Sequence, residues 1–323
     1  MKIESFFDFC SGIGGGRLGL EKCGLKCVGY ADTSRLSSLT YNLLFDTTGE
    51  KNYGNIKRIK SNTLPHFDLL ICGFPCQSFS VIGTKKGLDD SRGELINYVA
   101  VILKEVKPSC FILENVKGLV NHDKGQTLKT IISLLDKAGY RVEYKVLDSL
   151  NYGVPQSRKR IYFVGVRKAL ARSMKKFKWP DAVKQPQLVK YLTFKNIIRE
   201  TEIPYLLNYL NNRINQGNYS INELINLEET IIDTRMNDLR LFENRCPTLR
   251  SQRDGLLYSD GKTLYELCGE DALLLQGFPL EKVSKVSGIV SNRHILMQAG
   301  NAMTVTTIQK IGESLLSFME ELK

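Results

Sequence analysis

The segment DLLICGFPCQSFS, residues 68–80, joins an apolar run to a Pro-Cys step and small polar residues. Residues 68–72 are mostly apolar, which predicts a buried strand. Pro75 fixes its own φ and pushes Phe74 toward extended backbone, so the chain leaves the sheet in one direction. An isolated cysteine is most often a buried apolar residue. The small polar residues that follow Cys76 favour instead a thiol displayed at the strand's C-terminal end.

Two further strand ends carry charged residues. The run FILENV, residues 111–116, sets Glu114 into an apolar strand. A partly desolvated carboxyl group can act as an acid near neutral pH, although a strand-end glutamate can also simply face solvent. In QSRKRIYFVG, residues 156–165, Arg158 and Arg160 fall on one face of a strand by its period of two. A solvated charge run is the alternative there.

A thiol, a carboxylic acid and paired arginines on successive strand ends form the set needed to add a nucleophile to a pyrimidine ring. C6 of cytosine is a poor electrophile unless N3 receives a proton, which Glu114 can supply while Arg160 bonds the exocyclic oxygen. Attack by the thiolate then makes C5 nucleophilic. Such a carbon can take a methyl group from a sulfonium donor.

The N-terminus predicts a ligand-binding turn. Residues 5–9 read as a buried strand, and GIGGG, residues 12–16, as the turn into a helix where glycines let the backbone approach a ligand. Arg17 occupies the third glycine position of the strict dinucleotide fingerprint, which disfavours hydride chemistry. Asp32 follows at the end of the next apolar strand, roughly 20 residues on, where an acidic side chain can bond ribose hydroxyls.

The order of these motifs is informative. GFPCQ, ENV, QxRxR and Gly300-Asn301 follow one another as in the cytosine-C5 DNA methyltransferases of bacterial restriction-modification systems, which the chain resembles over nearly its whole length. The resemblance implies that Cys76 is the nucleophile, Glu114 the N3 proton donor, and Arg158 and Arg160 the residues that orient the base and its phosphate. It also implies a cytosine flipped out of the duplex, because stacking covers both ring faces.

The resemblance further implies S-adenosylmethionine as the cofactor, with Asp32 on its ribose. Cys10 stands where many relatives carry a phenylalanine, Thr33 where some have a large side chain, and Asn55 where an aspartate is usual. We expect binding to survive these departures in weaker form. The predicted cofactor residues are Cys10, Gly12, Ile13, Gly14, Gly15, Asp32, Thr33, Asn55, Ile56, Pro75, Leu95, Asn301 and Ala302.

Strands and helices alternate through about residue 167, which predicts a doubly wound, mostly parallel α/β sheet. The resemblance implies that this sheet is of the Rossmann-like methyltransferase type. By the resemblance a smaller target-recognition domain follows, in which RCPTLRS at residues 245–251 supports the fold. The predicted division is a catalytic and cofactor domain at 1–180, target recognition at 181–264, a hinge at 265–290 and a returning C-terminal helix at 291–323. The predicted DNA contacts are Gln77, Ser80, Lys85, Lys86, Arg92, Arg250 and Arg253.

Composition agrees with a nucleic-acid partner. The 323-residue chain has a formal net charge of +11, with Lys and Arg dispersed rather than gathered in a tail. Eight cysteines fit neither a disulfide scaffold nor a zinc pattern, and with three histidines we expect no metal. No apolar run has the length of a membrane span or signal peptide, so we expect a cytoplasmic protein. From its size we expect a bacterial or phage-encoded protein, and we also expect a monomer.

Three alternatives stay open at this point. A tRNA cytosine-C5 methyltransferase of the same family would carry LENVKG, residues 113–118, equally well. A non-enzymatic DNA-binding protein with this fold would not need Cys76, Glu114 and Arg160 together. A thiol-dependent NAD enzyme is disfavoured by the imperfect glycine loop and the lack of a plausible catalytic histidine. Labelled S-adenosylmethionine with duplex DNA or tRNA separates these classes.

Overall fold

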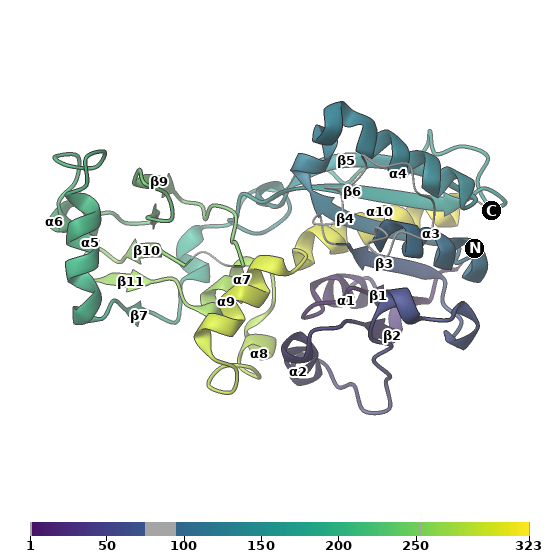
Figure 1. The fold of residues 1–323 in the computed structure, drawn as a ribbon, viewed down its shortest axis with the longest axis horizontal. Helices are drawn as coiled ribbons and strands as arrows, with labels where there is room; N and C mark the ends of the chain where they lie inside the picture. Colours follow the sequence, from purple (N-terminus) through teal and green to yellow (C-terminus); the bar gives the residue numbers. More distant parts are fainter. Residues whose placement is uncertain (1, 75–94, 252–253, 323) are drawn as a thin grey trace. The chain divides into compact units, whose positions relative to one another are not determined.

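A computed structural model describes residues 2–74, 95–251 and 254–322. The chain forms two compact units, each discontinuous in sequence (Figure 1). Unit 1 comprises residues 1–148, 159–181 and 303–323, and unit 2 comprises residues 149–158 and 182–302.

The division differs from the predicted one in two places. Residues 265–302, predicted as a hinge and part of the returning helix, belong to unit 2, because α7 (Gly269–Leu275) packs against α9 (Asn292–Asn301) and Asp271 of α7 accepts a hydrogen bond from Tyr258. Residues 149–158, predicted within the catalytic domain, also belong to unit 2. Only the segment from Met303 onward returns to unit 1.

The sheet of unit 1 has the strand order β2-β1-β3-β4-β6-β5. Neighbouring strands are parallel from β2 to β4, and β6 runs antiparallel between β4 and β5. This arrangement confirms the predicted mostly parallel sheet. The strands are β1 (Ser5–Phe9), β2 (Lys26–Ala31), β3 (Leu69–Gly73), β4 (Cys110–Val116), β5 (Tyr140–Asp148) and β6 (Lys159–Arg167).

Helices cover both faces of this sheet, which explains why β3 reads as a continuous apolar run. Leu70 and Cys72 pack in one core cluster with residues of α3 and α4, whereas Ile71 between them faces Gly16 of α1 on the other side. On that second side α10 packs along α1 (Figure 1). The helices of unit 1 are α1 (Gly15–Glu21), α2 (Arg35–Leu44), α3 (Leu95–Val106), α4 (Gln126–Lys137) and α10 (Val305–Glu321).

Unit 2 is built on a five-stranded antiparallel sheet of order β7-β11-β10-β8-β9. Two helices, α5 and α6, bury leucines against one face of it, where Leu206, Leu224 and Leu257 share a cluster. Besides α7 and α9, the strands and α-helices of unit 2 are β7 (Asn196–Ile197), α5 (Ile203–Leu210), α6 (Ile221–Ile225), β8 (Thr230–Asp233), β9 (Arg240–Glu243), β10 (Leu256–Ser259), β11 (Leu264–Glu266) and α8 (Leu280–Val283).

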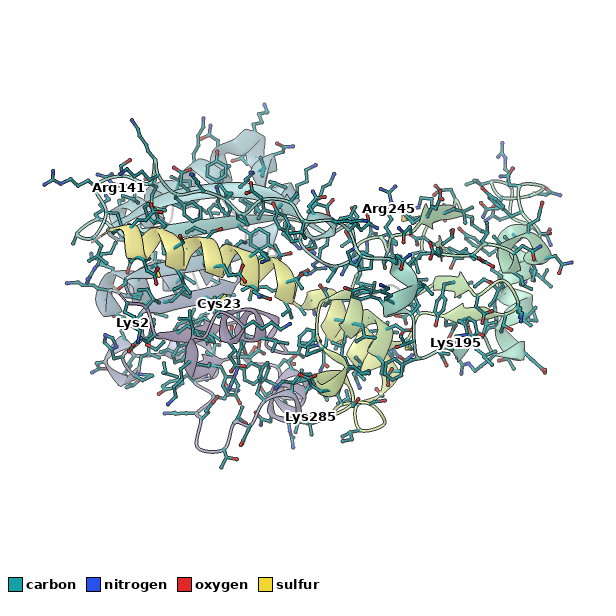
Figure 2. All side chains as sticks on the ribbon, turned by 180° about the vertical axis from the view of Figure 1, so that it is seen from behind. Lys2, Cys23, Arg141, Lys195, Arg245 and Lys285 are labelled. Carbon is teal, nitrogen blue, oxygen red and sulfur yellow. The ribbon has the colours of Figure 1, made fainter. Side chains whose placement is uncertain are left out.

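The positive charges are spread over both units. Figure 2 shows Lys2 and Arg141 on unit 1, and Lys195, Arg245 and Lys285 on unit 2. Within the described part of the chain, no helix combines the length and the apolar character that crossing a membrane requires.

Candidate active site

The strongest site candidate lies where β3, β4 and β6 meet at one edge of the unit 1 sheet. Gly73 ends β3 and is the register partner of Glu114 on β4, and two residues further on Val116 pairs with Arg160 near the start of β6. The carboxyl ends of parallel strands form the edge at which such sheets bind ligands. Because β6 is antiparallel, it brings its N-terminal residues to that same edge.

Glu114 and Arg160 form an ion pair there. Arg160 Nε lies 3.2 Å from Glu114 Oε1, and the two side chains are 13% and 11% exposed. A ligand can therefore reach the pair, while the surroundings exclude most water and strengthen its electrostatics. The structure brings these two residues together, and their chemical roles stay a prediction.

Asn115 has a contact that the sequence analysis did not assign. Its Nδ2 donates a 2.8 Å hydrogen bond to the carbonyl of Phe74, and the residue is 2% exposed. Phe74 is the last described residue before the Pro75-Cys76 step. The sequence held a signal for this contact, because Asn115 is an amide at the end of an apolar strand, next to a candidate acid. A buried amide must find hydrogen-bond partners.

Eight predicted site residues lie outside the described part of the chain, so their positions are not stated. They are Pro75, Cys76, Gln77, Ser80, Lys85, Lys86, Arg92 and Arg253.

Arg158 does not share the position of Arg160. Because β6 begins at Lys159, Arg158 precedes the strand, and the period of two does not place the two arginines on one face. Its guanidinium is buried in unit 2, where it donates to the carbonyls of Leu249, Gly300 and Ala302. The prediction that Arg158 orients the base and its phosphate is therefore corrected: this side chain is engaged by the protein's own backbone.

The glycine turn and Asp32 come together as predicted. The Gly12 amide donates a 2.8 Å hydrogen bond to Asp32 Oδ2, and the Ser34 amide donates a 2.7 Å bond to Oδ1. Burial raises the pKa of Asp32, and these amides oppose that shift. Each carboxylate oxygen keeps a second lone pair for a ligand hydroxyl.

Two glycines of this turn have a left-handed backbone conformation that other residues adopt only with strain. Gly12 has φ +56° and open space where a Cβ would stand, and Gly14 has φ +82° with Phe45 2.3 Å from that place. Cys10 also has a positive φ, of 50°. The carbonyl of Met303 lies 2.2 Å from the place of a Cβ on Gly15, a support that the sequence analysis missed.

The residues at this edge fit a nucleoside ligand. Ser11 Oγ is buried with no hydrogen-bond partner among the described residues, directly before the open space at Gly12. Asn55 accepts from the Lys57 amide at 3.0 Å, so its Oδ1 caps a short 3₁₀ helix. Ile13 and Ile56 are buried, Leu95 begins α3, and Thr33 is exposed.

Asn301 and Ala302 end α9 in unit 2, so their predicted part in the cofactor site stays a prediction.

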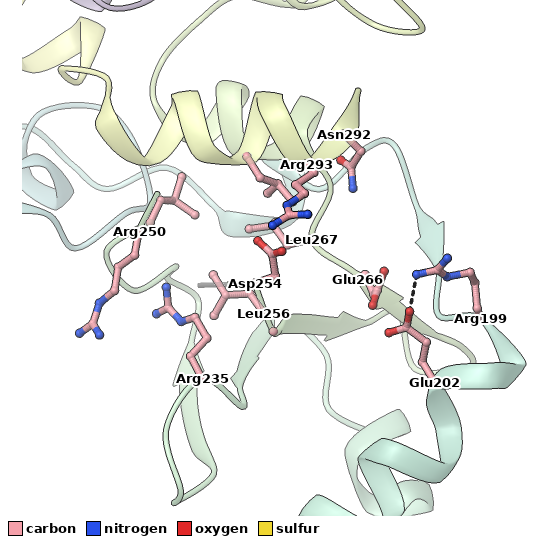
Figure 3. Close-up of a pocket in the computed structure, with 13 residues that line it drawn as sticks. Arg199, Glu202, Arg235, Arg250, Asp254, Leu256, Glu266, Leu267, Asn292 and Arg293 are labelled. Atoms are coloured by element: carbon pink, nitrogen blue, oxygen red, sulfur yellow. Dashed lines mark hydrogen bonds and ion pairs between the residues drawn. The ribbon is translucent and has the colours of Figure 1, made fainter. Parts of the chain in front are cut away.

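Arg250 lines a cavity of about 310 Å³ within unit 2, together with Arg235, Asp254 and Arg293 (Figure 3). Burial and the neighbouring Glu202 raise the pKa of Glu266 in the same cavity to about 7.

Comparison with known proteins agrees with this geometry. The profile of the C-5 cytosine-specific DNA methylase family matches residues 4–317. The type II methyltransferase M.DsaV of Dactylococcopsis salina is 32% identical over 99% of this chain and 88% of its own length. M.HaeII of Haemophilus aegyptius is 32% identical over 98% and 94%. The crystal structure of the S. pombe Dnmt2 methyltransferase shares the fold, with a TM-score of 0.69, 19% identity and 98% of each chain covered.

The chain therefore belongs to the C-5 cytosine-specific DNA methylase family. It is a DNA cytosine-C5 methyltransferase, and its cofactor is S-adenosylmethionine.

Proposed function

We propose that the chain methylates C5 of a flipped-out cytosine within one duplex DNA sequence, through a covalent bond between Cys76 Sγ and C6 of the base. The observation that carries this proposal is the Glu114–Arg160 ion pair at the edge where β3 delivers the chain to Pro75-Cys76. The guanidinium presents a hydrogen-bond donor for the exocyclic oxygen of cytosine, and the carboxyl group beside it, once it carries a proton, presents a proton donor for N3.

The Cys76 thiolate forms a bond to C6 while Glu114 gives a proton to N3, so that the electron pair of the C5–C6 double bond becomes available at C5. C5 would then form its bond to the methyl group as the methyl's bond to the donor's sulfonium sulfur breaks, its electron pair staying on that sulfur. Loss of the C5 proton to a base and departure of the Cys76 thiolate from C6 restore the double bond, and N3 returns its proton to Glu114.

S-adenosylmethionine supplies an electrophilic methyl group when bound. Asp32 would hold its ribose, Gly12 and Gly14 would let the backbone approach it, and Ile56 would lie against the adenine beside Asn55. Arg160 would hold the base during both the addition and the elimination. Asn115 would fix the carbonyl of Phe74, so that the chain enters the Pro75-Cys76 step from one place.

The finer assignments belong to the same proposal. Unit 2 would read the DNA sequence, with Arg250 as one of its contacts, and the protein would act as a monomer in the cytoplasm of a bacterium or a phage-infected cell. The dispersed excess of basic residues supports a polyanionic partner. The relatives named type II methyltransferases support a place in a restriction-modification system.

Duplex DNA with 5-fluorocytosine tests the proposal. Addition and methylation can proceed on this base, but fluorine cannot leave as a cation, so elimination stops. We expect a covalent protein–DNA adduct that survives denaturation and forms only with S-adenosylmethionine. The adduct should be absent with Cys76→Ala and strongly reduced with Arg160→Ala, whereas the exposed Arg172→Ala serves as the matched control and should form it normally.

The substrate class is decided in the same assay. A library of fluorinated duplexes of random sequence is offered beside fluorinated tRNA. Trapping on tRNA alone would refute the DNA assignment in favour of an RNA substrate. An adduct that forms with Cys76→Ala would refute the covalent role of that thiol.

A further inference from the structure

Arg158 stands at a point where the chain passes between the two units. The passages fall between residues 148 and 149, 158 and 159, 181 and 182, and 302 and 303. Ser149, Arg158 and Ala302 are the unit 2 residues at three of these passages.

Arg158 is hydrogen-bonded to each of the other two inside unit 2. The carbonyl of Arg158 accepts from the Ser149 amide at 3.2 Å. Its Nη2 donates to the carbonyl of Ala302 at 3.0 Å and to that of Gly300 at 3.1 Å. One residue thus fastens three passages of the chain together.

The same guanidinium reaches the segment that carries Arg250. Nη1 of Arg158 donates to the carbonyl of Leu249 at 3.2 Å, and the amide of Leu249 donates to Gln156 Oε1 at 3.2 Å. Thr248 Oγ1 also donates to the carbonyl of Ser157 at 2.7 Å. Residues 156–158 therefore hold the backbone immediately before Arg250 by its polar groups.

Only an arginine can make this set of contacts. Its planar fork offers several donors in fixed directions, whereas a lysine ammonium is a compact point charge. Arg158 is 2% exposed, and burying a charge costs free energy unless hydrogen bonds compensate it. Arg158 carries this cost at a junction between the two units. This indicates that its role is to fix the backbone geometry there and not only to stabilise the fold.

We propose that Arg158 is a positioning residue of the methyl-transfer reaction. It holds the segments at Ser149 and Ala302 and the backbone before Arg250 together within unit 2, and the chain continues from it directly into β6, two residues before Arg160. Binding of DNA by unit 2 is thereby coupled to the arginine that holds the base. This inference rests on the proposed function, and it replaces direct contact with DNA as the role of Arg158.

The test compares Arg158→Lys with Arg172→Lys, an exposed arginine outside the site. Calorimetric titration with S-adenosylmethionine measures the fraction of folded protein. It is suitable because the residues proposed to hold the ribose lie in unit 1, whereas Arg158 lies in unit 2. Tritium transfer to unmethylated plasmid DNA then gives kcat and KM per binding-competent molecule. We expect Arg158→Lys to bind the cofactor within about twofold of the unmodified protein and to lose about 100-fold in kcat, the scale of an ångström-sized misplacement. Arg172→Lys should keep both values.

Normal kcat per cofactor-binding molecule in Arg158→Lys, with lowered thermal stability alone, would overturn the positioning role. An unmodified protein that labels no DNA would instead refute the proposed function, so the two failures are distinguishable. If Arg158→Lys does not fold, hydrogen exchange on the unmodified protein tests whether Arg158 holds these segments in place. The amides of Ser149 and Leu249 should exchange slowly before DNA is added, and exchange at the rate of exposed loops would refute the fastening.

Discussion

Asn115 Nδ2 donates a 2.8 Å hydrogen bond to the carbonyl of Phe74, so the residue next to the candidate acid holds the backbone that leads to the candidate nucleophile. The bond joins β4 to the end of β3 at the edge where Gly73 and Glu114 are register partners. The neighbour of the acid thus holds Phe74, the last described residue before the Pro75-Cys76 step. Four measurements follow from this arrangement and from its surroundings.

Asn115→Ala removes the donor that fixes Phe74. We expect a loss of about 1–3 kcal/mol in the free energy of unfolding, because a buried hydrogen bond is broken. We also expect kcat to fall by at least about tenfold, since the thiol is no longer delivered to one place. Urea unfolding and single-turnover methylation measure the two effects. An unchanged single-turnover rate would show that this bond supports only the fold.

Glu114→Gln keeps the size of the side chain and removes its acidic proton. Methyl transfer should fall by orders of magnitude, because an amide cannot deliver a proton to N3, while affinity for duplex DNA is largely kept. Single-turnover tritium transfer and a gel-shift titration check this, with the exposed Glu105→Gln as the matched control. Equal rates for Glu114→Gln and the unmodified protein would mean that another group activates the ring.

Asp32→Ala should weaken S-adenosylmethionine and its demethylated product alike, because both carry the same ribose. The loss should be about 1–3 kcal/mol in each binding free energy, measured by calorimetry. Asp32→Asn is the informative companion, since one amide oxygen can still accept from the Gly12 amide, which separates the shape of the turn from contact with the ribose. Unchanged affinity of Asp32→Ala for both ligands would place the ribose elsewhere.

Asp8 gives a pH-dependent prediction. Burial raises the pKa of Asp8 to about 8, against the opposing effect of the Arg17 charge. Between about pH 4, where the unfolded chain releases this proton, and about pH 8, the folded protein retains it, so stability falls as the pH rises through that window and levels off above it. Asp8→Asn has no proton to lose and should escape this fall.

Urea unfolding of the unmodified protein and of Asp8→Asn at about pH 5, 7 and 9 measures the effect. The difference between their unfolding free energies should change by up to about 1.4 kcal/mol per pH unit below about pH 8, in favour of the variant as the pH rises. A difference that does not vary with pH would exclude Asp8 as the titrating group.

The local pattern of the sequence was sufficient for the central strands and for the Glu114–Arg160 edge. The apolar runs at 5–9, 68–72 and 111–116 predict buried strands because burial on both faces demands uninterrupted apolar side chains. Glycines before a helix and an acid roughly 20 residues later predict a ligand-binding turn at Gly12 with Asp32 nearby, and the structure adds the hydrogen bond between the Gly12 amide and Asp32. These features depend on residues that are near in sequence or on adjoining parallel strands, where order along the chain nearly determines order in space.

What the sequence alone did not decide depends on contacts between distant segments. β5 was not predicted, because this edge strand keeps a partly exposed face and reads as a mixed polar run. The extent of unit 2 depends on α7 and α9 packing together, and the place of Arg158 depends on carbonyls up to 144 residues away. Two arginines separated by one residue look equivalent by strand periodicity. Only the tertiary structure, by starting β6 at Lys159, sends Arg160 to Glu114 and buries Arg158 among backbone acceptors.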